Sequence, residues 1–257
     1  MFKQLYAYRE LLKTSIKKEI RGKYKASALG ILWSFINPLL QVLVYAIVFP
    51  YLLGRTQDNY LVYLVTGIIP WTFLQTTIVS CVGIVKNNAN IIKKVYFPRE
   101  ILPISSGLSG LINFFISCII ILIFCVLSGV GISWHIIFVP MIAIIELMFA
   151  LGIGMALGAC DAYVQDLEYI VTFLLQMAFY GSPIIYQIDL IGSNSILATM
   201  VRLNPVTIII NSYRDVFLNH IMPDFQALGI VFVIALIVLM LGYMIFKKLE
   251  KGFAEQF

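Results

Sequence analysis

The sequence predicts an all-α membrane protein with six transmembrane helices, and three observations lead to this fold class. Of the 257 residues, 61% are hydrophobic and only 12% are charged, against about 25% in ordinary soluble domains. The mean hydropathy is +0.94, and long apolar runs carry no charge. A soluble interior could not bury this much apolar surface, and the composition also excludes a disordered chain. Six spans of about 20 residues use roughly half of the chain, so a nucleotide-binding domain would have to come from another polypeptide.

The first element, residues 1–28, is predicted to be an amphipathic helix at the cytoplasmic interface of the membrane. Apolar residues recur there at spacings of three and four, at Phe2, Leu5, Tyr8, Leu12, Ile16 and Ile20. Basic residues fall largely on another face, although Arg9 and Glu19 interrupt the apolar stripe. A basic amphipathic helix lies flat on a membrane surface. It serves either as a simple anchor or as a platform for a cytoplasmic partner, and the pattern leaves both open.

The next 219 residues, 29–247, are predicted to form the transmembrane domain, followed by a cytoplasmic tail at 248–257. The uncharged run from Ile101 to Ile145 is too long for one helix, and we divide it at Ser128-Gly129-Val130-Gly131. Each resulting segment is long enough to cross a bilayer. The six expected spans are approximately 29–53, 60–85, 101–127, 134–159, 168–188 and 225–246.

The basic residues predict the orientation. Fifteen of the 18 Lys and Arg residues lie before the first span, between spans two and three, or after span six. By the positive-inside rule, these segments and both termini are cytoplasmic. This asymmetry accounts for the net charge of +5, so there is no reason to invoke nucleic acid.

The outer segment between spans five and six, residues 187–224, is unusually long and apolar for a connector. Asn204-Pro205 is typical of a helix N-cap followed by a first-turn proline. Apolar residues then recur at helical spacing, at Val206, Ile209, Ile210, Tyr213 and Phe217. We expect re-entrant helices that dip into the outer leaflet over a pathway; the alternative is a surface helix without a role. The candidate residues of an outer gate are Tyr186, Asn204, Pro205, Tyr213 and Arg214.

Motifs for catalysis and metal binding are missing from the sequence. There is no GxxxxGK[ST] phosphate loop, no HExxH, no GxSxG and no cluster of His and Cys at metal-ligand spacing. We therefore expect no catalytic residue, no metal and no cofactor in this chain. Glu146 is the one acid deep inside a span, where it either makes a structural hydrogen bond or belongs to a pathway. The glycines of segment 152–158 predict close helix packing.

Five separate stretches, in order along the chain, carry a resemblance to a known family. They are Arg21–Trp33 with Asn37-Pro38-Leu39, Thr66–Trp71, Asn88–Pro103, Ser182–Tyr186 and Leu203–Thr207. Together they resemble the permease subunits of polysaccharide-exporting ABC transporters, which export O-antigen, teichoic acid, capsule and related glycans. One departure is Gln165-Asp166, where the family often has Arg-Asp, so only Asp166 carries over.

The resemblance implies a passive permease that moves a lipid-linked polysaccharide to the outer side of the bacterial inner or plasma membrane. Two copies would pair as a homodimer and dock on two ABC ATPase subunits, which bind the ATP and Mg²⁺. The loop at 86–100 would be the coupling helix, ending near Phe97 because of Pro98; the alternative is a positive-inside signal alone. The implied coupling residues are Asn87, Asn88, Asn90, Lys93, Lys94, Phe97, Pro98, Arg99, Glu100 and Asp166.

Aromatic side chains are the candidates for contact with the glycan, because sugars have apolar C–H faces on which rings stack. The channel candidates are Trp33, Tyr45, Trp71, Phe73, Phe179, Tyr180 and Tyr186. For each ring, a place in the core or in an interfacial belt is the alternative. Three alternatives to glycan export also remain open: an ABC permease for drugs or other lipids, a membrane-embedded enzyme of glycan-lipid metabolism, and a proton-coupled carrier.

Overall fold

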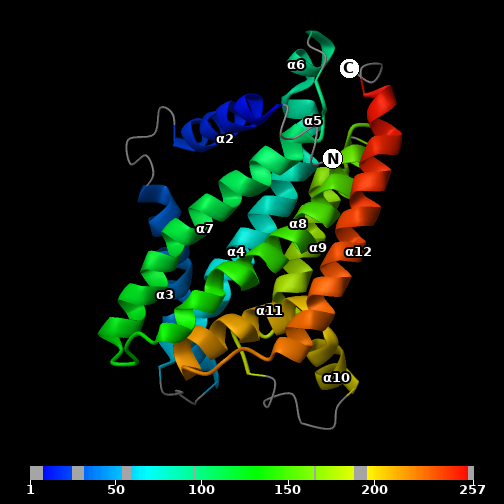
Figure 1. The fold of residues 1–257 in the computed structure, drawn as a ribbon. Coiled ribbons are helices and arrows are strands. Elements are labelled where there is room, and N and C mark those ends of the chain that lie inside the picture. The colour runs from blue at the N-terminus through cyan, green and yellow to red at the C-terminus, as the bar shows by residue number, and fades with distance from the viewer. Residues whose placement is uncertain are drawn as a thin grey trace.

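The computed structural model describes residues 8–24, 32–53, 59–94, 97–164, 166–187 and 196–253. Within these ranges the chain folds into helices and turns, without a strand (Figure 1). The predicted all-α class is therefore confirmed for the part of the chain that the structure describes.

Four helices are long and apolar enough to cross a membrane. They are α4 (Tyr60–Val82), α7 (Ile101–Leu127), α8 (Val139–Asp161), which follows the short 3₁₀ helix η2 (Trp134–Phe138), and α12 (Phe225–Leu249). Two further apolar segments lie in α3 (Trp33–Leu53) and α9 (Leu167–Tyr180). At 1.5 Å per residue, the 14 residues of α9 span about 21 Å, less than the roughly 30 Å of a hydrocarbon core. The chain is thus a multi-pass membrane protein, while the count of six spans stays a prediction.

Glycine and proline explain where the apolar helices end. Between α7 and α8, Gly129 and Gly131 have φ angles of 74° and 82°, which side chains other than glycine rarely adopt. The predicted break is therefore confirmed. Helix α9 ends at Tyr180 rather than near residue 188, and Gly181-Ser182-Pro183 follows it. The residue before a proline disfavours helical backbone, so the chain turns there.

Glycines bring α8 close to two neighbours. A Cβ atom added at Gly152 would lie 2.6 Å from the backbone nitrogen of Leu239 in α12. One added at Gly154 would lie 2.6 Å from Cys81 Cβ in α4, and Gly158 faces the Cys81 carbonyl. The close packing predicted for segment 152–158 is therefore confirmed, and α8 lies between α4 and α12.

The connecting elements gather at the two ends of the bundle (Figure 1). Helices α2 (Arg9–Tyr24), α5 (Ile84–Asn87) and α6 (Ala89–Lys94) lie at the same end as the C-terminal end of α12. Helices α10 (Ile196–Leu203) and α11 (Pro205–Arg214) lie at the opposite end. By the positive-inside pattern we expect the first end to face the cytoplasm, and we call the two ends inner and outer below.

The amphipathic pattern predicted for residues 1–28 is described only in part. Helix α2 packs against α7, Leu12 contacts the buried cluster around Phe97 and Phe253, and Ile16 is half-buried. Phe2 and Leu5 lie outside the described residues.

Candidate functional site

The loop 84–100 presents a polar surface at the inner end of the bundle. Asn87, Asn90, Lys93 and Lys94 are exposed on α5 and α6, whereas Ile92 is buried. Helix α6 is described as far as Lys94, and Phe97 and Pro98 lie outside any helix, as expected because a proline disfavours helical backbone in the residue before it. The buried side chain of Ile92 therefore anchors this part of the loop to the protein, while the amide and ammonium groups remain exposed to solvent.

Asn88, one of the buried members of the predicted coupling residues, connects this loop to α2. Its Nδ2 donates to the Ile84 carbonyl at 2.9 Å, and its Oδ1 accepts from Lys18 Nζ at 3.3 Å. Helix α2 and the loop thus form one continuous inner surface. Asp166, at the start of α9, is exposed on that side, and Gln165 lies outside the described residues.

The second half of the loop is attached to the end of α12. Glu100 is fully buried and accepts from Lys247 Nζ at 2.7 Å. The Arg99 guanidinium donates to the Glu250 carbonyl and lies 5.8 Å from the ring centroid of Phe253. Phe97 is buried in the same cluster as Phe253. These members of the predicted coupling set therefore face the protein, and Pro98 between them is half-buried.

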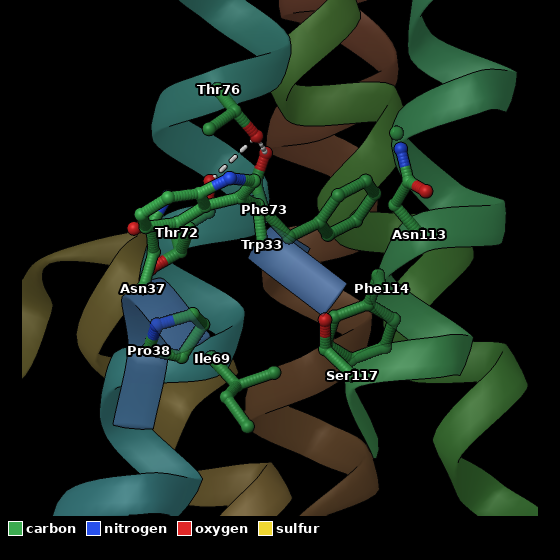
Figure 2. A pocket seen from close by; sticks show the side chains of 11 residues that line it. Trp33, Asn37, Pro38, Ile69, Thr72, Phe73, Thr76, Asn113, Phe114 and Ser117 are labelled. Carbon is green, nitrogen blue, oxygen red and sulfur yellow. Dashed lines mark hydrogen bonds between the residues drawn. The ribbon is translucent and has the colours of Figure 1, made fainter. Parts of the chain in front are cut away.

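A cavity of about 290 Å³ opens between α3, α4 and α7 (Figure 2). Its wall combines three aromatic rings with hydroxyl and amide side chains from all three helices. The lining residues are Trp33, Asn37, Pro38, Ile69, Thr72, Phe73, Thr76, Gly110, Asn113, Phe114 and Ser117. Two of the seven predicted channel aromatics, Trp33 and Phe73, line this cavity.

The other channel candidates lie elsewhere. Phe179 stacks on Tyr45 with centroids 5.9 Å apart and contacts Trp71 at 5.7 Å and Tyr180 at 5.3 Å. Phe179 and Trp71 are 5% and 3% exposed, so they belong to the core of the subunit, whereas Tyr180 is 58% exposed. Tyr186 is half-buried in the outer turn, defined here as Gly181–Gln187.

The outer turn is held by side chains of α4 and α11 that bind its backbone carbonyls. Arg214 donates to the carbonyls of Pro183 at 2.7 Å and Ile184 at 2.9 Å. Tyr63 donates to the carbonyl of Tyr186 at 2.7 Å. Asn204 caps α11 by accepting from Val206 N at 3.0 Å, and its Nδ2 donates to Ser182 Oγ at 3.2 Å. Three of the five predicted gate residues, Tyr186, Asn204 and Arg214, therefore meet at this turn. Pro205 begins α11, and the hydroxyl of Tyr213 binds α8 instead.

Two features of this arrangement escaped the sequence patterns. The Arg214 guanidinium lies 3.6 Å above the ring centroid of Tyr63, a cation–π contact. A Cβ added at Gly67 would lie 2.9 Å from Arg214 Nη2, so glycine is the residue that leaves room for this side chain. Arg214 lies outside the candidate spans. Burial lowers its pKa to about 10, so it remains charged at neutral pH. The sequence signal that could have indicated this contact is Gly67, a glycine inside an apolar helix.

Glu146 has its partner in the outer segment. Its Oε2 accepts from the Tyr213 hydroxyl at 2.8 Å, and both side chains are buried. Of the two interpretations of Glu146, the structural hydrogen bond is the one that the geometry shows. Among the described residues, no three His, Cys, Asp or Glu side chains come together as metal ligands would.

These features define a multi-pass membrane protein with a polar surface at one end, a cavity without charged groups on its described wall, and a hydrogen-bonded turn at the other end. The chain belongs to the ABC-2 type transporter family, whose profile matches residues 10–218. It is 30% identical over 255 residues to an O-antigen export system permease protein, RfbA, of Myxococcus xanthus, covering 99% of this chain and 98% of the relative. It is 31% identical over 248 residues to the protein of the same name from Klebsiella pneumoniae, covering 96% and 94%.

Proposed function

We propose that this chain is the membrane-spanning permease subunit of an ATP-driven exporter of lipid-linked polysaccharide. The substrate moves from the cytoplasmic to the outer side of the bacterial inner or plasma membrane. The observation that carries the proposal is the similarity to O-antigen export permeases over nearly the whole length of both chains. The family match by itself covers residues 10–218 and names no substrate. The similarity to the O-antigen export permeases covers nearly all of both chains and does name one.

The proposed topology has six spans, made by α3, α4, α7, α8, α9 and α12, with both termini in the cytoplasm. Four of these helices have sufficient length and hydropathy. The orientation rests on the distribution of Lys and Arg. Between α9 and α12, the helices α10 and α11 would form the re-entrant pair at the outer end.

The proposed assembly pairs two copies of this chain with two ABC ATPase subunits, which bind ATP and Mg²⁺. The exposed side chains of the loop 84–100, together with Asp166 and α2, form the docking surface for the ATPase. Phe97, Arg99 and Glu100 would not contact the ATPase themselves; they would connect the loop to the end of α12, which they contact. A force on the loop is thereby transmitted to a membrane-spanning helix.

The proposed pathway needs surfaces that tolerate sliding of a polar chain and a closure that holds at rest. The rings of Trp33 and Phe73 line the cavity described above, and Tyr180 is exposed. The outer turn with α11 closes the outer end of the subunit. Its hydrogen bonds to Arg214, Tyr63 and Asn204 favour one closed arrangement.

Deletion of the gene and reconstitution of the complex test this function together. Cells lacking the chain are expected to retain lipid-linked polysaccharide inside and to lose it from the surface, and the wild-type gene should restore it. In proteoliposomes, ATP-dependent transfer should require this chain together with its ATPase subunit, and the purified chain alone should not hydrolyse ATP. Unchanged surface polysaccharide in the deletion strain, with altered sensitivity to drugs instead, would assign the chain to another class of ABC export.

A further inference from the structure

The cavity between α3, α4 and α7 has a composition that selects among sugars. Among the described residues that line it, none is charged. Instead, hydroxyl and amide groups alternate with aromatic rings (Figure 2). We infer that this cavity binds a neutral sugar unit of the glycan and rejects acidic ones, an inference that rests on the proposed function.

The hydroxyl groups of the wall are oriented by their own helix. Thr72 donates to the Ile68 carbonyl at 2.8 Å, and Thr76 donates to the Thr72 carbonyl at 2.7 Å. A hydroxyl has one proton and two lone pairs, so each oxygen retains acceptor capacity for a sugar hydroxyl. The amide of Asn37 adds a group that both donates and accepts. The wall thus offers hydrogen-bond acceptors and donors to a sugar, whose hydroxyl groups can both donate and accept.

The aromatic rings supply the apolar part of the site. Phe73 and Phe114 are stacked with centroids 5.0 Å apart and are 3% and 2% exposed, so they form a fixed wall. Trp33 is 40% exposed at the start of α3 and is the ring available to a ligand entering from the inner half of the bundle. A sugar ring placed between Trp33 and this wall would bury its C–H faces and keep its hydroxyls on the Thr and Asn groups.

Size and charge limit the ligand. A volume of about 290 Å³ lies at the lower end of the range for small-molecule sites, which suits a short piece of glycan rather than a folded polymer. A carboxylate or phosphate would lose its hydration without meeting a cation on the described wall, and burying an unpaired charge is costly. Neutral hexoses therefore enter, whereas uronic acids and sugar phosphates do not.

The experiment uses the fluorescence of Trp33 in the full-length chain reconstituted in nanodiscs. Replacing the other two tryptophans, Trp71→Phe and Trp134→Phe, leaves Trp33 as the sole reporter. The probes are dodecyl glucoside and dodecyl glucuronide, which share a tail and differ by one carboxylate, with dodecanol as the tail alone. We expect a saturable change with the glucoside and binding of the glucuronide weaker by about tenfold or more.

A matched pair of variants separates the site from the membrane around it. Thr76→Val removes one wall hydroxyl and should weaken glucoside binding about two- to tenfold. Thr172→Val removes the same type of hydroxyl, which donates to the Glu168 carbonyl on α9 away from the cavity, and should leave binding unchanged. A dodecanol response equal to that of the glucoside shows that the cavity takes lipid tails and overturns the inference, as does equal binding of both sugars.

The proposed function is tested separately, by measuring polysaccharide export by the wild-type complex. If that complex exports glycan and Trp33 does not respond to the glucoside, the inference about the cavity fails and the export function stands. If export is absent while Trp33 distinguishes the two sugars, the export function fails and the sugar site stands.

Discussion

The hydrogen bond between Tyr213 and Glu146 makes a quantitative prediction about closure of the outer end. It joins α11 to the middle of α8 through two buried side chains 2.8 Å apart. Tyr213→Phe removes the donor and keeps the ring, so the packing of α11 changes little. Side-chain hydrogen bonds inside membrane proteins contribute about 0.6 kcal/mol on average and about 1.7 kcal/mol at most.

If this bond exists only in the closed arrangement, its loss raises the ratio of open to closed forms. At about 1.4 kcal/mol per factor of ten, the two energies correspond to roughly threefold and sixteenfold more open form. Release of a small dye from proteoliposomes without ATP should increase by a factor within this range. Glu146→Gln should leak less than Tyr213→Phe, because an amide oxygen still accepts from the Tyr213 hydroxyl.

The control is Tyr163→Phe, which removes a tyrosine hydroxyl that donates to the Leu249 carbonyl at 2.8 Å, at the inner end. This variant should stay as tight as the wild type. Leakage from Tyr163→Phe equal to that from Tyr213→Phe would point to general loosening. Wild-type tightness of Tyr213→Phe at normal thermal stability would refute the reasoning, and α11 would then be a surface helix without a gating role.

Three further predictions concern topology, coupling and packing. Single cysteines at Asn59 and Asn90, both exposed, in a cysteine-free background should react with an impermeant thiol reagent from outside and inside respectively, and external labelling at 90 would contradict the topology. Lys93→Glu should lower polysaccharide export per ATP hydrolysed without reducing the amount of protein in the membrane; normal export would leave the loop as a topology signal only. Gly242→Ala, whose added Cβ would meet the Gly152 backbone, should destabilise the chain by about 1–3 kcal/mol and lower its Tm. Gly229→Ala on the same helix, where an added Cβ meets nothing within 4 Å, should not.

Features governed by neighbouring residues could be predicted from the sequence. The break between α7 and α8 depends on the backbone freedom of Gly129 and Gly131, and the start of α11 depends on Asn204-Pro205. The close approach of α8 follows from the absence of Cβ atoms at its glycines. Each of these effects acts within a turn or one helix face, so its pattern is visible along the chain.

Features made by distant residues could not be predicted in this way. Glu146 and Tyr213 are 67 positions apart, and helical spacing alone does not pair an acid in one helix with a hydroxyl in another. The same holds for the aromatic residues, because Trp71 and Trp33 are equally suited to line a passage by composition. The packing of α4 against its neighbours leaves Trp71 3% exposed, whereas Trp33, at the start of α3, is 40% exposed.

The attachment of the loop 84–100 to the end of α12 has a consequence for biosynthesis. Glu100 is synthesised well before its partner Lys247, which lies 147 positions later in the chain. Until then, Glu100 lacks the cation that it meets in the finished fold. We therefore expect the loop 84–100 to reach its final position only after α12 has been synthesised, and the proposed docking surface for an ATPase to be incomplete in a chain truncated before Lys247.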